Sequence, residues 1–400
     1  MDRGEARRIW EAGLAAADPA AGVAAALEDV PGDRPTLVIA AGKAALRMLD
    51  GAAAWLVALP EPAEVLAVTN AENAGGRAGV MVGEHPVPGE GSLAAGRAVI
   101  AALGRAGEGA RVLALLSGGA SALLAAPAPG LTLADEAEVA RLLLASGADI
   151  GEANLVRQHL SVLKGGGLAR LAAPAEVVAL ILSDVIGDDL RAVASGPTSG
   201  PLGTPAEALA LCARLGIADA LPRAVLAHLA AAEARPVPEA VNVLVGSNAL
   251  SLAAMGRAAL GARVHAEPLV GDVAEAAARV MAAGPGVHLF GGETTVKIRG
   301  QGRGGRNQEL ALRVALLAEA AGARLTFLAA GTDGRDGPTE AAGGIVDEGT
   351  AARIREAGGD PEALLADNDS HAALALSGDL MVTGGTGTNV ADLAVLIRRA

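Results

Sequence analysis

The chain has 400 residues, of which 52% are apolar and 19% are charged, and its formal net charge is −13. This composition is that of a globular protein and excludes a disordered chain. The acidic balance, with two Trp, two Phe and no Tyr, disfavours nucleic-acid binding, which needs a basic surface and stacking aromatic rings.

Nothing in the sequence suggests export or a membrane span. The single cysteine, Cys212, has no partner for an internal disulfide. The first residues mix acids with bases and lack an apolar signal core, and no uncharged apolar run approaches the roughly 18–20 residues of a membrane helix. We therefore expect a cytoplasmic protein with neither membrane nor nucleic-acid partners.

In the first half of the chain, strands alternate with helices after one or two amphipathic helices in residues 5–30. Apolar runs predict strands, and alanine- and leucine-rich stretches predict helices between them. This alternation is typical of an α/β fold, in which ligands bind at the carboxyl ends of the strands. The expected strands are 36–41, 65–69, 112–116 and 177–182, and the expected helices are 44–49, 93–103, 132–147, 151–163 and 204–234.

The second half begins after a proline-containing stretch at 234–240, which we interpret as a linker. The length favours two domains, and we place them at 1–236 and 237–400. The second domain is also predicted to be α/β. Its strands are expected at 241–245, from 289, at 325–329, 380–383 and 393–397, with helices from 248 to about 259 and at 273–283.

Lys43 follows the first predicted strand, in the turn Gly42-Lys43. A cation at the start of a helix is unfavourable unless an anion lies nearby, so Lys43 is interpreted as facing the ligand crevice. The chain retains only three lysines, Lys43, Lys164 and Lys297, against its general use of arginine. Lys164 precedes three glycines, which either bind a ligand or cap a helix.

The run Ser117-Gly118-Gly119-Ala120-Ser121 follows the strand at 112–116. It is not a nucleophile elbow, since leucine occupies the first glycine position of G-x-S-x-G. Two interpretations remain open: a cradle for an anion, or close packing of a strand on a helix.

Asp184 and Asp189 lie after the apolar strand at 177–182, beside Gly187. Magnesium prefers one or two carboxylates together with phosphate oxygens. This segment is therefore a candidate Mg²⁺ site, and helix capping by aspartate is the alternative.

Residues 299–306 form a loop that alternates glycine with arginine, between a strand and an alanine-rich helix. Glycine lets a backbone turn its N–H groups toward a ligand, arginine adds forked donors, and the helix start adds free N–H groups. Together these features predict a phosphorylated or carboxylated ligand.

Gly300, Gly302 and Gly305 match G-x-G-x-x-G, but this match is a weak signal for a dinucleotide. Glycine is abundant, with 54 residues, and no acidic residue ends a strand about 20 positions later. A Walker A motif and a kinase H-R-D triplet are absent from the sequence. Anion loops, candidate Mg²⁺ carboxylates and placed cations nevertheless match the needs of phosphoryl transfer.

Several blocks of the sequence resemble the signature motifs of the glycerate 2-kinases of the MOFRL family. The blocks lie at 40–45, 83–88, 117–121, 160–169, 183–198, 291–312, 329–347 and 383–393. The resemblance implies ATP- and Mg²⁺-dependent phosphorylation of D-glycerate to 2-phospho-D-glycerate. It also implies a larger N-terminal Rossmann-like αβα domain with a parallel sheet, a smaller C-terminal MOFRL-type α/β domain, and an active site in the cleft between them.

The resemblance makes Lys43 and Arg306 the expected catalytic cations, and we interpret Asp333 as a candidate base for the acceptor hydroxyl, with its pairing to Arg335 as the alternative. Asp184 and Asp189 are the expected metal ligands. One departure is Gly385, where relatives commonly have proline. The remaining ATP- or substrate-binding candidates are Ser117, Gly118, Gly119, Ser121, Lys164, Glu293, Arg303, Asn307, Gly385, Thr386 and Asn389.

Two other functions are open at this stage. Members of this family have been labelled hydroxypyruvate reductases, which require NAD(P)H, and a non-enzymatic sensor of a sugar acid or nucleotide is a third interpretation. A kinase reaction with D-glycerate and ATP separates them. Alanine-rich helices also permit a homodimer.

Overall fold

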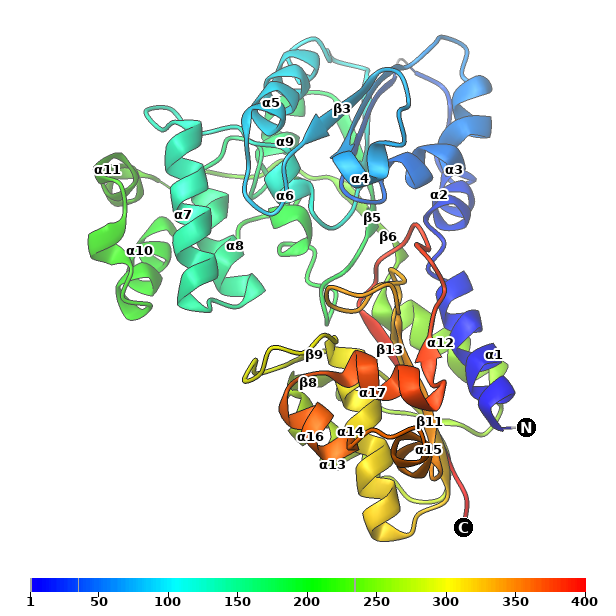
Figure 1. Cartoon of the computed structure of the whole chain (residues 1–400). Coiled ribbons are helices and arrows are strands. Elements are labelled where there is room, and N and C mark those ends of the chain that lie inside the picture. Colours follow the sequence, from blue (N-terminus) through cyan, green and yellow to red (C-terminus); the bar gives the residue numbers. More distant parts are fainter. Residues whose placement is uncertain (1, 35, 234) are drawn as a thin grey trace. The chain divides into compact units, whose positions relative to one another are not determined.

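The computed structural model describes residues 2–34, 36–233 and 235–400. The chain divides into two compact units, whose strands and helices are coloured along the sequence in Figure 1. The N-terminal unit comprises Pro19–Ser183 and Asp188–Val245. The C-terminal unit comprises the residues up to Asp18, Asp184–Gly187 and Gly246–Ala400. The predicted α/β class with two domains is confirmed.

The N-terminal unit contains a six-stranded sheet of order β3-β2-β1-β4-β5-β6. The chain moves outward from β1 in one direction and then from β4 in the other, so the order reverses between these two strands. In open α/β sheets of this kind the ligand crevice forms at that reversal, outside the carboxyl ends of the strands. The strands are β1 Thr36–Ala41, β2 Glu64–Asn70, β3 Val80–Gly83, β4 Arg111–Leu116, β5 Glu176–Leu182 and β6 Val241–Gly246.

Helices accompany this sheet, and four of them, α7, α8, α10 and α11, share an apolar core of their own that includes Cys212. Capping boxes at Thr132, Asp149 and Thr204 define where α7, α8 and α10 begin. The helices are α2 Pro19–Leu27, α3 Ala45–Val57, α4 Ala71–Ala74, α5 Glu90–Leu103, α6 Ala120–Leu123, α7 Leu133–Ser146, α8 Ile150–His159, α9 Gly167–Ala172, α10 Pro205–Arg214 and α11 Arg223–Ala231, with 3-10 turns Val193–Ser195 and Ala218–Ala220.

The C-terminal unit contains a mixed sheet of order β12-β11-β10-β13-β9-β7, with β8 paired to β9. Strand β13 runs antiparallel to both β9 and β10. Its first residues therefore lie at the same edge as the last residues of β9 and β10. The strands are β7 Arg263–Val264, β8 Leu269–Asp272, β9 Gly286–Thr295, β10 Leu325–Gly331, β11 Gly343–Asp347, β12 Leu380–Met381 and β13 Asp392–Arg398.

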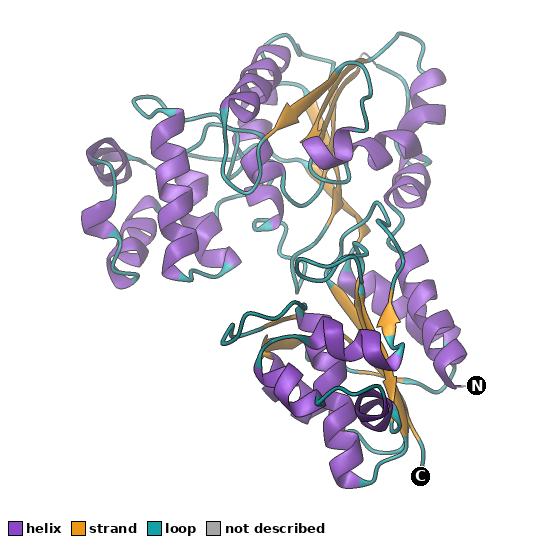
Figure 2. Cartoon of the chain, viewed as in Figure 1, coloured by secondary structure: helices purple, strands orange, loops and turns teal. Residues whose placement is uncertain are grey.

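Both faces of this second sheet are covered by helices, shown in purple in Figure 2. One core joins the sheet to α13 and α14, and the other joins it to α1 and α12. In the part of the chain that the structure describes, no helix is long and apolar enough to cross a membrane. The helices are α1 Asp2–Ala15, α12 Asn248–Ala258, α13 Val273–Met281, α14 Arg306–Ala321, α15 Thr350–Glu356, α16 Pro361–Ala366 and α17 Ser370–Ser377.

Two elements differ from the predicted ranges 1–236 and 237–400. Strand 241–245, expected to open the second domain, is β6 at the edge of the first sheet. Helix α1, expected in the first domain, packs in the C-terminal unit. A strand or helix carries its own periodicity in its sequence but does not specify which surface covers it, so neither pairing was readable from the residues alone.

Helix α1 is attached to the second sheet by Trp10, whose side chain is fully buried and whose indole N–H donates to the Ala330 carbonyl at 3.4 Å. Replacing Trp10 by alanine should lower the free energy of unfolding of the C-terminal unit by about 3–5 kcal/mol, because a large cavity is left. Urea unfolding monitored by circular dichroism measures this loss. The partly exposed Trp55, in the N-terminal unit, is the matched control. A loss in Trp10→Ala no larger than in Trp55→Ala would contradict the assignment of α1.

Candidate active site

The turn that carries Lys43 lies at the reversal of the first sheet, between β1 and β4. The Lys43 N–H donates to the Gly118 carbonyl at 2.9 Å, which joins this turn to the loop after β4. Gly42 has φ +127°, and a Cβ there would lie 2.1 Å from the Ser117 hydroxyl oxygen. Glycine is therefore required at position 42 both for its conformation and for this close approach.

The loop after β4 uses its hydroxyl groups internally. The Ser117 oxygen accepts the Ala44 N–H at 3.1 Å, and the Ser121 oxygen lies 2.6 Å from that of Ser195. The N–H groups of Gly118 and Gly119, in contrast, donate to no oxygen in the described residues. The serines thus pack the turn, as one interpretation of the sequence has it, and the anion cradle stays a prediction that these N–H groups permit.

Two basic side chains, Lys43 and His85, lie together over Gly119. A Cβ on Gly119 would lie 3.2 Å from Lys43 Cγ and 3.4 Å from His85 Cδ2. Burial, Lys43 and Arg157 lower the pKa of His85 to about 4, and Glu72 opposes them only in part. His85 is therefore a neutral imidazole at neutral pH, and the positive charge of this cluster comes from Lys43 and Arg157.

Lys164 is buried, at 4% exposure, and its ammonium lies 3.8 Å from the Glu136 carboxylate. Burial lowers the pKa of Lys164 to about 8, against the attraction of Glu136, and the neighbouring Arg157 lowers it further. Neither Glu136 oxygen has a hydrogen-bond partner among the described residues. Lys164 and Arg157 thus bring two cations beside one carboxylate, which favours a second negative group nearby.

In the C-terminal unit, Arg306 begins α14 and is held by carboxylates from two strands. Its Nε and one terminal nitrogen donate to the two Asp392 oxygens at 2.6 and 3.0 Å, and its other terminal nitrogen lies 3.2 Å from Glu293. Burial alone would lower the pKa of Arg306, but Asp392 and Glu293 raise it above its ordinary value. The guanidinium is therefore permanently charged and fixed in orientation.

Further carboxylates act on Glu293, one of the two partners of this guanidinium. Burial raises the pKa of Glu293, Arg306 lowers it, and the charges of Asp392, Asp184 and Asp333 raise it again. The Glu293 side chain is 48% exposed, so solvent moderates this repulsion. The topology brings Glu293, Asp333 and Asp392 together, because the start of β13 and the ends of β9 and β10 share one edge, whereas Asp184 comes from the segment after β5.

The first part of the glycine- and arginine-rich loop uses its backbone N–H groups within the protein. Its N–H groups from 299 to 303 donate to oxygens of Asp367, Asn368 and Asp369. A Cβ on Gly300 would lie 2.3 Å from the Asp367 carbonyl oxygen, and Gly302 is equally close to this segment. Gly300 and Gly302 thus allow two parts of the chain to pack. The N–H groups of Gly304, Gly305 and Arg306 donate to no oxygen in the described residues, so binding of an anion at this end of the loop stays a prediction.

The start of α14 is likewise occupied by a side chain of the protein. Asp336 accepts the N–H groups of Asn307 and Gln308 at 3.1 and 2.8 Å, so these N–H groups are not free for a ligand. Burial raises the pKa of Asp336, and these two N–H donors lower it in part. Asn307, a predicted binding residue, is buried at 2% exposure with its amide 3.4 Å from Asp336. It stabilises the helix start.

Arg303 and the loop 384–389 lie at the surface of the same unit. The Arg303 guanidinium donates to the Pro338 carbonyl at 3.0 Å. The Thr386 hydroxyl donates to the Thr332 carbonyl at 2.5 Å, and the Asn389 side chain accepts the Ala391 N–H at 3.1 Å. These side chains hold the loop in place, whereas a Cβ on Gly385 would meet no atom within 4 Å.

The two predicted metal ligands, Asp184 and Asp189, have different neighbours. Asp184 belongs to the group of carboxylates around Glu293. Asp189 forms a two-pronged ion pair with Arg191 at 2.7–3.2 Å, which lowers its pKa. Among the residues that the structure describes, no group of three or more His, Cys, Asp or Glu side chains is arranged to hold a metal ion.

Asp333 accepts the backbone N–H of Arg335 at 3.0 Å, and its charge acts on Glu293. A Cβ on Gly331 would lie 3.2 Å from Asp333 Oδ1 and 3.5 Å from Asp392 Oδ1, so Asp333 lies near the carboxylate that holds Arg306, and its role as a base stays a prediction.

Comparison with known proteins identifies the family. A model of a domain of unknown function (DUF4147) matches residues 5–230, and the MOFRL family model matches residues 286–392. The D-glycerate 2-kinase of Thermotoga maritima is 38% identical over 90% of this chain and 89% of its own length. The chain belongs to the MOFRL family of glycerate 2-kinases.

The crystal structure of a glycerate kinase from Thermotoga maritima matches this MOFRL-family chain with a TM-score of 0.89 and 35% identity, over 99% of both chains. A relative from Agrobacterium vitis is 40% identical over 98% of this chain and 93% of its own length, and carries the provisional name of a hydroxypyruvate reductase.

Sequence reasoning missed Asp392 and Glu136 in this MOFRL-family chain. Asp392 is the first residue of β13, directly after the loop that the motifs had singled out. An acid at the start of a buried strand is unusual, and this was the available signal. Glu136 appears in the sequence as one of two acids in the first turn of a helix, and only the fold reveals that it is buried.

The low pKa of His85 gives a direct test of the cluster around Lys43. Because the unfolded chain binds a proton near the ordinary pKa of 6.5 and the folded chain near 4, His85 contributes to stability above this window and loses that contribution as the pH falls through it. Proton NMR should show the His85 ring titrating near pH 4, well below the ordinary imidazole value of 6.5. Lys43→Met should move the pKa of His85 upward. An unchanged pKa would show that the Lys43 charge does not act on His85.

Proposed function

We propose that the chain catalyses transfer of the γ-phosphoryl group of ATP to the 2-hydroxyl of D-glycerate, with ADP and 2-phospho-D-glycerate as products. Membership of the glycerate 2-kinase family supports the reaction class. The observation that carries the proposal is the fixed guanidinium of Arg306, held by two hydrogen bonds to Asp392. Phosphoryl transfer depends on positioned positive charge more than on covalent chemistry, and this group supplies it.

In the N-terminal unit, we assign phosphate binding to Lys43 with the free N–H groups of Gly118 and Gly119. An ammonium and two backbone donors neutralise charge without forming a bond to the ligand. Their place at the strand reversal agrees with the general position of ligands in such sheets. Lys164 and Arg157 add positive charge to the same end of the unit, and Glu136 keeps part of it balanced.

In the C-terminal unit, Arg306 stabilises the charge on the transferring phosphoryl oxygens. Asp333 accepts the proton of the 2-hydroxyl as the oxygen–phosphorus bond forms and the bond to the ADP oxygen breaks. The remaining carboxylates orient the arginine. We further propose that both units act on one pair of substrates, so that loss of either cation lowers turnover.

Mg²⁺ fits this assignment through Asp184. Burial raises the pKa of Glu293, and the neighbouring Asp392, Asp184 and Asp333 raise it further, so negative charge accumulates there and supports a divalent cation. When bound, the ion would supply neutralisation of phosphate charge, and Asp184 would hold it together with phosphate oxygens. Asp189 is engaged by Arg191 and would have to exchange that partner to take part.

The reductase alternative has weaker support from the geometry. A bound NAD(P)H needs free N–H groups at a helix start for its pyrophosphate. The candidate fingerprint at Gly300, Gly302 and Gly305 precedes a helix whose start is capped by Asp336, and the loop itself is bonded to the segment 367–369.

Lys43→Ala and Arg306→Ala should each reduce turnover by about 10²–10³-fold, as expected when a stabilising donor is removed. The measurement is ADP release with D-glycerate, ATP and Mg²⁺, with phosphorus NMR to identify the product. Lys297→Ala is the matched control, since Lys297 is 73% exposed and pairs with Asp272 at the surface. Near-normal turnover in both active-site variants, or NADH oxidation with hydroxypyruvate in place of ADP release, would refute the proposal.

Asp392→Asn should lower kcat by about 10²-fold through loss of the fixed orientation of Arg306. The KM for D-glycerate should change less, because the guanidinium remains present. Asp272→Asn, which disturbs a surface ion pair, should leave both constants unchanged. Equal rates for Asp392→Asn and the wild-type chain, with the same melting temperature, would show that Arg306 needs no such partner.

A further inference from the structure

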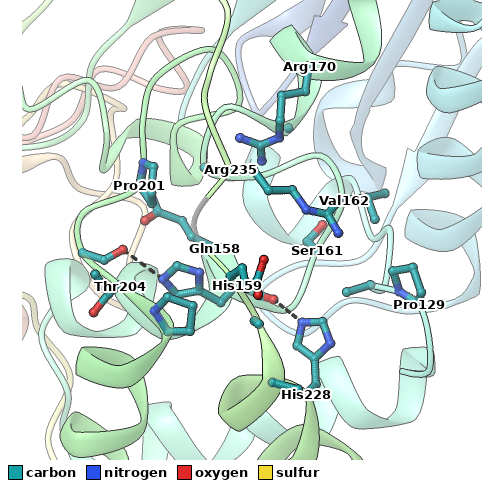
Figure 3. A pocket seen from close by; sticks show the side chains of 18 of the residues that line it. Pro129, Gln158, His159, Ser161, Val162, Arg170, Pro201, Thr204, His228 and Arg235 are labelled. Atoms are coloured by element: carbon teal, nitrogen blue, oxygen red, sulfur yellow. Dashed lines mark hydrogen bonds between the residues drawn. The ribbon is translucent and has the colours of Figure 1, made fainter.

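A cavity of about 700 Å³ lies within the N-terminal unit and does not include the turn that carries Lys43 (Figure 3). Its wall is formed by the end of α8, the turn that leads into α9, the loop 201–205 and the segment that follows α11. Small-molecule sites in proteins commonly have volumes of about 300–1,000 Å³. The cavity is therefore large enough for a metabolite.

One segment separates this cavity from the candidate active site. Gln158 and His159 line the cavity, whereas the adjacent Arg157 lines a small pocket with Glu136 and Lys164. Successive residues at the end of α8 thus serve two different sites. The cavity is not a continuation of the cluster around Lys164.

Two arginines, Arg170 from α9 and Arg235 from the segment after α11, line the cavity and lie near one another (Figure 3). Burial lowers the pKa of Arg170, and the charge of Arg235 lowers it further. Neither guanidinium forms an ion pair with a carboxylate in the described residues. Glu233 is the one acid among the described lining residues, and it is exposed. The cavity therefore has uncompensated positive charge.

The histidines of the cavity are held in place by backbone carbonyls. His159 Nε2 donates to the Gly203 carbonyl at 3.0 Å, and His228 Nε2 donates to the His159 carbonyl at 2.8 Å. Much of the remaining wall is apolar. It includes Pro129, Val162 and Leu171. The lining thus combines a cationic part with an apolar part.

We propose that this cavity binds a small amphipathic anion, with a phosphate or carboxylate between Arg170 and Arg235 and an apolar body against Pro129, Val162 and Leu171. Forked arginine donors suit either anionic group. This site is separate from the proposed kinase reaction and does not depend on it.

Gln158, which lines the cavity, is hydrogen-bonded to two other segments of the N-terminal unit. Its amide nitrogen donates to the Arg191 and Ser195 carbonyls at 2.6 and 3.2 Å, and its amide oxygen accepts the Leu202 N–H at 2.8 Å. The Ser195 hydroxyl in turn lies 2.6 Å from that of Ser121, in the loop after β4.

The test uses 8-anilinonaphthalene-1-sulfonate, an anion with an apolar body, as a fluorescent probe of the full chain. We expect saturable binding that weakens at least tenfold in the double variant Arg170→Gln/Arg235→Gln and is unchanged in Arg223→Gln. Arg223 is an exposed arginine of α11 that does not line the cavity. No saturable binding, or equal affinity in the double variant and the wild-type chain, would overturn the proposal.

Competition distinguishes the two anionic groups. Displacement by AMP identifies a phosphate-bearing ligand, displacement by benzoate identifies a carboxylate, and displacement by neither overturns the assignment to this class of anion. The double variant should melt no lower than the wild-type chain, because removing two neighbouring like charges relieves their repulsion. If it does melt lower, Arg235→Gln alone supplies the binding test, since Arg235 is exposed and lies outside a helix.

Discussion

The need of buried backbone N–H groups for an acceptor decides which glycine-rich segments of this protein can serve a ligand. In the loop 299–303 every N–H is bonded to the segment 367–369, and the start of α14 is bonded to Asp336. In the loop after β4, two glycine N–H groups have no acceptor among the described residues. Sequences that look equally suited to anions therefore differ once their hydrogen bonds are accounted for.

Hydrogen bonding also sets the Arg306 side chain apart from the backbone of the loop that precedes it. The N–H groups at 299–303 are bonded within the protein, those of 304–306 have no acceptor among the described residues, and the Arg306 side chain is directed by Asp392 and Glu293. Gly300 and Gly302 allow the supporting segments to pack. In the N-terminal unit, backbone N–H groups without an acceptor lie beside Lys43.

Periodicity and motif order predicted the α/β class, most of the strands, and the positions of Lys43 and Arg306 at strand or helix ends. They did not predict that α1 and β6 cross the expected boundary, because the partner of an element depends on the whole fold. The contacts of Asn307 with Asp336 and of Arg303 with Pro338 could not be predicted from the sequence either. A polar residue beside a glycine has the same appearance in a sequence whether it contacts a ligand or caps a helix.

The docking of α1 has a consequence for synthesis of the chain. Trp10 and its neighbours pack with Leu393 and Val395, which belong to β13 near the opposite terminus. Helix α1 must therefore wait until β13 has been synthesised, while the sheet β1 to β6 has its complete sequence much earlier. During this interval an apolar helix face is exposed, and it is a natural target for a chaperone.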